Sequence, residues 1–148
     1  MDIANQLALI DRLCAREFPA ERGRTDVGTG GPGYLTAELL HSGDPGEADA
    51  ADREETEAQY EADRDALAER LSERWGPPQH FSLYSVLERL TVGDAVVAEP
   101  WGTLSGHVPD VQLWHIPGAG RWFALGVSRW GGEPPYRLLA VVTETDPV

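Results

Sequence analysis

The chain has 148 residues, of which 41% are hydrophobic, and five Trp, four Tyr and three Phe supply bulk for a core. This size suffices for one domain whose core needs no disulfide or metal, and the composition excludes a wholly disordered chain. Twenty-five acidic residues against twelve basic ones give a net charge of −13, which argues against direct nucleic-acid binding and against anionic membrane surfaces.

Residues 1–43 are predicted to form a helix and a Gly-rich connection. Apolar side chains recur there at helical spacing, at Ile3, Leu7, Ile10 and Cys14. Pro19 ends the run, and the stripe places Cys14 on the apolar face, where a buried and unreactive thiol is expected. The polar, Gly-rich segment 21–33 is interpreted as the connection, and a second short helix is predicted over 34–40.

Residues 44–75 are predicted to form a long acidic helix. The run Asp44-Pro45-Gly46-Glu47 fits a helix start, with a cap, a proline in the first turn and a Glu three residues after the cap. The run Trp75-Gly76-Pro77-Pro78 fits its end. Twelve acidic residues and four Arg lie within the segment. A stripe of larger side chains predicts packing on a core, at Tyr60, Leu67, Leu71 and Trp75. We therefore expect firm helix over 57–75 and leave open whether 47–57 is ordered.

Residues 76–148 are predicted to be mainly antiparallel sheet. A short strand over 80–84 and a brief helix over 85–90 come first. Strand patterns then follow over 94–99, 111–116, 121–129 and 137–143. The connections between the later strands are Gly- and Pro-rich and too short for a parallel crossover, so neighbouring strands are expected to be antiparallel. Alternate small residues within 122–128 leave room on one face of that strand for close approach by a helix or a partner.

Together these segments predict one α+β domain spanning 1–148. N-terminal helices, including the long acidic helix, pack in it on a C-terminal antiparallel β-meander of about four strands. The first residues lack the basic start and apolar run of a signal peptide, and no apolar segment approaches the about 20 residues that span a bilayer. Arg without any Lys is typical of a GC-rich bacterial genome. We therefore expect a cytoplasmic bacterial protein that has no membrane partner.

A Gly-x-Gly-x-x-Gly spacing occurs over Gly28–Gly33. A dinucleotide site needs such glycines directly after a strand and before a helix, and the charged residues 20–26 predict no strand. The chain also has no Lys for a P-loop. We therefore predict a connection without a cofactor, with a phosphate-binding or partner-contacting loop as the alternatives.

Metal-ligand side chains occur at His107, Asp110 and His115. Their spacing is not that of a zinc site, and an extended strand would place Asp110 on the face opposite His115, so no metal is predicted. Ser105 lies one place off the Gly-x-Ser-x-Gly pattern of a nucleophile elbow. The sequence thus predicts no catalytic residue and a protein that is not an enzyme.

Aromatic side chains concentrate in the strand region, and most are expected to be core. Trp130 is the exception, because it borders a Gly- and Pro-rich hairpin with few neighbours to bury it. Exposed aromatic and Arg side chains are typical of interface hot spots. The residues predicted to bind a partner are Trp101, Arg129, Trp130, Glu133 and Tyr136.

The function that these patterns favour is a non-enzymatic acidic domain that binds a basic protein partner. Toxin-neutralising immunity proteins, antitoxins and chaperones are the classes of protein that such a domain would suit, since acidity speeds encounter with a basic target. One alternative is a small-ligand-binding protein or an enzyme with a pocket between the helices and the sheet. Another is a DNA mimic whose carboxylates within 44–74 imitate phosphates.

Overall fold

The fold was analysed in a computed structural model that describes residues 3–26, 28–41, 50–92, 99–116, 118, 120–130 and 133–144. Seven strands form one sheet in the order β1-β2-β3-β7-β6-β5-β4, and every pair of neighbours is antiparallel. The strands are β1 (Gly23–Arg24), β2 (Gly28–Gly31), β3 (Tyr34–His41), β4 (Gln79–Ser82), β5 (Asp110–Ile116), β6 (Arg121–Trp130) and β7 (Glu133–Thr143). An α+β class with an antiparallel sheet is confirmed, but the sheet has seven strands where about four were predicted.

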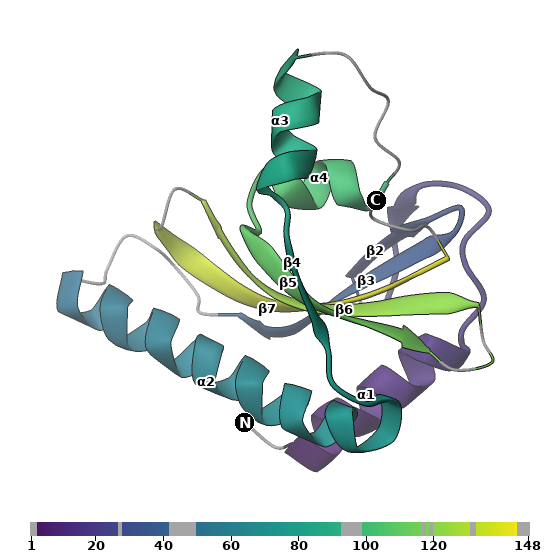
Figure 1. The fold of residues 1–148 in the computed structure, drawn as a ribbon, viewed down its shortest axis with the longest axis horizontal. Coiled ribbons are helices and arrows are strands. Elements are labelled where there is room, and N and C mark those ends of the chain that lie inside the picture. The colour runs from purple at the N-terminus through teal and green to yellow at the C-terminus, as the bar shows by residue number, and fades with distance from the viewer. Residues whose placement is uncertain are drawn as a thin grey trace.

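In the described part of the chain, four helices cover the two faces of this sheet. They are α1 (Ile3–Ala15), α2 (Ala50–Trp75), α3 (Tyr84–Val92) and α4 (Trp101–Ser105). The first two lie on one face, and α3 and α4 lie on the other (Figure 1). None of the helices, within the part of the chain that the structure describes, is long and apolar enough to cross a membrane.

The face under α1 and α2 is apolar along its length. Alternate residues of the strands point to it and are buried, at Leu35, Ala37, Leu39, Trp114, Ile116, Phe123, Leu125, Val127, Leu138, Ala140 and Val142. Ile10 and Leu13 of α1 and Leu67 and Leu71 of α2 cover them. The predicted helical stripes of both segments are therefore confirmed as the sides that pack on the sheet.

The long helix ends where its sequence predicted. Gly76 has a φ of +86°, which favours glycine, and its N–H donates to Ser72 O over 2.9 Å. Trp114 of β5 donates its indole N–H to Gly76 O over 3.0 Å, so the end of α2 is held on β5, one strand in from the edge of the sheet. At its other end α2 begins at Ala50, whereas the predicted capping residues Asp44–Glu47 lie outside the described residues.

The face under α3 and α4 is covered over only part of its width. Here a second buried cluster joins both helices to strands β5, β6 and β7, through Leu83, Val86, Trp101, Leu104, Val108, Val111, Leu113, Ala124, Leu139 and Val141. The small side of β6 is approached closely at Gly126, where a Cβ atom would lie 2.7 Å from Val108 Cγ1, but Val108 belongs to the loop after α4 and not to a helix or a partner as predicted. Strands β2 and β3 contribute nothing to this cluster, and their side chains on this face border a cavity.

Two predictions for residues 21–40 were wrong. The Gly-rich segment contains β1 and β2 instead of a plain connection, and Tyr34–His41 is a strand instead of a helix. The apolar residues of this segment, Leu35, Ala37 and Leu39, recur at every second position, which is the spacing of a strand. The strand β3 is held in the sheet by antiparallel pairing with β7. The helix α4 was not predicted, and residues 94–98 of the predicted strand 94–99 lie outside the described residues.

Candidate functional site

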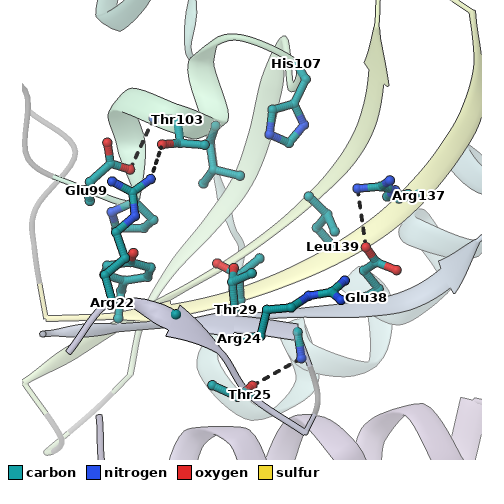
Figure 2. Close-up of a pocket in the computed structure, with 16 residues that line it drawn as sticks. Arg22, Arg24, Thr25, Thr29, Glu38, Glu99, Thr103, His107, Arg137 and Leu139 are labelled. Carbon is teal, nitrogen blue, oxygen red and sulfur yellow. Dashed lines mark hydrogen bonds and ion pairs between the residues drawn. The ribbon is translucent and has the colours of Figure 1, made fainter. Parts of the chain in front are cut away.

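A cavity of about 570 Å³ lies beside α4, over strands β2, β3 and β7. Four separate segments line it: 22–25, 28–38, 99–107 and 137–139. Figure 2 shows polar and charged side chains from these segments directed into the same space. The cavity exists because α3 and α4 stop short of β2 and β3, so that the outer part of the sheet faces no helix on this side.

Three charged side chains, Arg24, Glu38 and Arg137, form one end of the cavity, which we call the arginine end. Arg137 Nη1 lies 3.3 Å from Glu38 Oε1, and the two side chains are 35% and 43% exposed. Arg24 extends along the sheet toward them (Figure 2), and its guanidinium makes no ion pair with any residue that the structure describes. Two positive charges therefore face one negative charge.

His107 lies above the arginine end and is half-buried. Its Nδ1 is 2.6 Å from the hydroxyl of Ser128, which is buried in β6. Burial lowers the pKa of His107 below its ordinary value of 6.5, and the nearby positive charge of Arg137 lowers the pKa further. The imidazole is accordingly neutral at pH 7 and adds hydrogen-bonding capacity without charge.

The opposite end of the cavity is closed by hydrogen bonds around α4. Thr103 donates its backbone N–H to Glu99 Oε2 over 3.3 Å, and its hydroxyl accepts a hydrogen bond of 3.4 Å from Arg22 Nη2. At this end the positive charge of Arg22 is balanced by the negative charge of Glu99. The two ends therefore differ in charge, and the excess of positive charge lies at the arginine end.

Apolar groups line the space between the two ends. Leu104 of α4 and Leu139 of β7 are buried members of the second core cluster, and Pro100 and Tyr34 are also buried. A molecule in the cavity would thus meet an apolar wall in the middle and charged groups at its ends. That combination is typical of small-molecule sites in proteins.

The residues predicted to bind a partner do not gather at this cavity. Trp101 and Tyr136 are each only 1% exposed, and Trp101 packs in the core cluster under α3 and α4. In the folded chain neither side chain offers a surface to a partner. Trp130 and Glu133 are paired in the β6–β7 hairpin through their backbones. Their side chains and that of Arg129 lie outside the described residues, so this part remains a prediction.

The side chains considered for metal binding or catalysis also lie apart from one another in the structure. His107 faces the cavity, whereas Asp110 lies 3.9 Å from Arg64 of α2 on the other side of the sheet. His115 packs its ring against Trp122 at a centroid distance of 4.7 Å. Ser105 donates its hydroxyl to Gly102 O over 2.7 Å, so it is not paired with His107. Among the described residues there is no group of three or more ligands that could hold a metal.

The glycine motif over Gly28–Gly33 forms a hairpin between β2 and β3. A strand follows it instead of a helix, so the backbone arrangement that cradles a pyrophosphate is lacking. Gly28 is needed for close packing, because a Cβ atom there would lie 2.1 Å from Thr36 O. The motif helps to build the wall of the cavity without itself being a phosphate loop.

The residues that define the cavity were not predicted from the sequence. Arg22 and Arg24 lie in a segment interpreted as a connection, and Glu38 lies in a segment predicted to be helical. The alternation of apolar and polar residues over 34–39 was the signal that could have identified β3 and placed Thr36 and Glu38 on one face. Nothing in the sequence joins these residues to Arg137, because the pairing of β3 with β7 links distant parts of the chain.

Comparison with known proteins found no matching family model, no similar curated protein and no similar solved structure.

Proposed function

We propose that this domain binds a small molecule in the cavity beside α4. The observation that carries the proposal is the convergence of four chain segments, with charged groups at both ends and apolar groups between them, around about 570 Å³. Ligand sites in proteins commonly have volumes of about 300–1,000 Å³. The proposal corresponds to one of the alternatives that the sequence left open.

The side chains that surround the cavity favour binding over catalysis. His107 is hydrogen-bonded to Ser128, whose hydroxyl is buried and is not part of the cavity wall. Ser105 is turned toward its own helix. Neither serine is presented to a substrate, and the proposal is therefore a binding protein whose polar groups orient its ligand.

A cavity-filling variant tests the proposal. Thr36 lies on β3 at the cavity wall, and Thr36→Trp would occupy part of the space while keeping a residue type that strands accept. Native mass spectrometry of the protein isolated from its own host should show a bound small molecule in the wild type and a reduced amount in Thr36→Trp. The matched control Thr56→Trp, on α2 at the other face of the sheet, should retain the molecule.

The proposal fails if the wild type carries no small molecule and none in a metabolite collection raises its thermal stability. It also fails if Thr36→Trp and Thr56→Trp bind equally well. Circular dichroism of both variants would verify that each keeps the fold.

A second candidate function is the binding of a basic protein by the outer side of α2. Where the burial of this helix is described, over residues 54–75, six acidic residues are exposed: Glu54, Glu55, Glu61, Asp65, Glu69 and Glu73. Exposed acids on a rigid helix speed the encounter with a basic surface. Trp130 remains the predicted anchor for such a partner, and the partner itself would be an effector that this domain neutralises or escorts.

Affinity capture from host lysate at low and moderate salt tests the second candidate. One stoichiometric basic protein should be captured, with weaker capture at moderate salt. The double variant Glu61→Gln and Glu69→Gln should reduce capture, and Trp130→Ala should weaken binding by more than about 1 kcal/mol without loss of fold. Equal capture by wild type and charge variant would reject this function, and a nucleic-acid-binding protein as the captured species would favour the DNA mimic.

A further inference from the structure

We propose that the ligand carries an anionic head group, a carboxylate or a phosphate, that is held between Arg24 and Arg137 at the arginine end of the cavity. This inference rests on the proposed small-molecule function and names the chemical class of the ligand. It concerns a positively charged site in a chain whose net charge is −13.

The first argument is the local charge. Three of the twelve basic residues of the chain, Arg22, Arg24 and Arg137, line this one cavity, against two acidic residues, Glu38 and Glu99. The charge of Arg22 is matched at its own end by Glu99, which shares Thr103 with it. One positive charge is therefore in excess at the arginine end, and an anionic group would offset it.

The second argument is the hydrogen-bonding capacity of the two arginines. Arg137 contacts Glu38 through Nη1, while its buried Nε has no hydrogen-bond partner among the residues that the structure describes. Arg24 is exposed at the cavity rim and has no ion-pair partner in the same described ranges. Guanidinium groups form paired, charge-assisted hydrogen bonds with carboxylates and phosphates. Both therefore retain donors for an anion.

The third argument is the position of the neutral groups. His107 is held by Ser128 at 2.6 Å beside the arginine end, and its lowered pKa keeps a second positive charge from accumulating next to Arg137. The buried side chains of Leu104 and Leu139 line the same cavity, and Leu139 lies next to Glu38 and Arg137 (Figure 2). A ligand with an anionic head and a short apolar body would match this combination of groups.

Three probes of nearly the same size test this inference: phenylacetate, phenyl phosphate and the neutral amide phenylacetamide. Binding is followed by the shifts of backbone amide resonances during titration of the full chain. We expect at least one of the two anions to shift resonances of β1, β3 and β7 and to bind at least about tenfold more tightly than the amide. The tighter of the two anions identifies the head group as carboxylate or phosphate.

Arginine variants locate the anion. Arg24→Gln and Arg137→Gln should each weaken binding of the anion about tenfold or more and leave the weak binding of the amide unchanged. Arg24→Gln is the safer variant for folding, because Arg24 is exposed and makes no ion pair in the described part of the chain. Arg70→Gln, an exposed position on α2, is the matched control and should bind the anion like the wild type.

Equal binding of phenylacetamide and both anions in the cavity would overturn the anionic head group but would leave the small-molecule function standing. Unchanged anion binding by Arg24→Gln and Arg137→Gln would overturn the assigned position. Absence of binding by all three probes would overturn the inference, and the test by native mass spectrometry would then decide separately whether the cavity holds another kind of ligand.

Discussion

The two faces of the sheet differ in what their side chains meet. On the face under α1 and α2, alternate residues of the strands from β3 to β5 are apolar and buried. On the face under α3 and α4, apolar contacts end at β7, and Thr36, Glu38 and Arg137 lie next to the cavity instead of a helix. The face under α1 and α2 thus forms a continuous core. The face under α3 and α4 forms a core over β5, β6 and β7 and borders the cavity over β2 and β3.

This difference separates the part of the fold that supplies stability from the part in which we propose binding. A closed apolar face contributes most of the free energy of folding, since burial of apolar area is the dominant favourable term. Polar strand residues beside the cavity contribute less to folding and are available to a ligand. Three predictions follow from this difference: the first compares side chains of the two faces, and the other two concern one face each.

The largest effect is expected at Phe123, a fully buried residue of β6. Its ring lies 5.4 Å from that of Trp75 and 6.0 Å from that of Trp114, so Phe123→Ala would leave a void among large side chains. We expect the free energy of unfolding to fall by about 3–5 kcal/mol, as measured by urea denaturation. Thr36→Ala at the cavity should cost less than about 1 kcal/mol. Similar losses for both variants would remove the proposed distinction between the faces.

The next effect concerns Cys14, which packs against the closed core. Burial raises the pKa of its thiol to about 11, the negative charge of Asp11 adds to the rise, and Arg121 and Arg74 oppose it. Because the thiolate is the reactive form, alkylation by iodoacetamide at pH 8 should be about a hundredfold slower in the folded protein than in urea. A folded thiol that reacted as fast as the unfolded one would mean that α1 does not protect it.

The smallest effect is expected at His107, on the cavity side. Its pKa in the folded protein is lowered by burial and by Arg137, so the unfolded chain takes up the proton first as the pH falls below about 6.5. The free energy of unfolding that the neutral imidazole contributes is fully present above pH 6.5. It is lost as the pH falls from 6.5 to the lower pKa that His107 has in the folded protein. His107→Gln should therefore lose less stability than the wild type between pH 7 and pH 5 in urea denaturation. If the wild type and His107→Gln showed the same pH dependence of stability, folding would not lower the pKa of His107.

Local patterns predicted the elements whose partners are near in sequence or whose ends are marked. Helix α1 follows from its apolar stripe, and Gly76 and the prolines after it mark the end of α2. The strands β5, β6 and β7 follow from β-rich runs separated by Gly and Pro. Segment 34–41 was misread because an eight-residue run offers few periods to distinguish a strand from a helix, and its pairing with β7 decided the outcome.

The candidate site was much less predictable than the fold. An Arg in a polar segment is ordinarily a solvated residue, and nothing next to Arg24 in the sequence indicates that Glu38 and Arg137 lie near it. Trp101 shows the opposite error, since it was predicted to bind a partner and is instead the buried first residue of α4. The grouping of Arg24 with Glu38 and Arg137 and the burial of Trp101 both depend on contacts between distant segments of the chain. Composition and periodicity carry no information about such contacts.

The position of β7 has a consequence for the order of folding. Thr143 donates its hydroxyl to Gly33 O over 2.9 Å across 110 positions of sequence, and β1, β2 and β3 join the other described strands through the pairing of β3 with β7. Pairings of such long range form late, because closing a large loop costs chain entropy before the contacts of the pairing offset that cost. We therefore expect β4, β5, β6 and β7 to assemble as a unit before β3 docks with its hairpin. The cavity, whose walls come from both parts, would then be among the last features of the molecule to form.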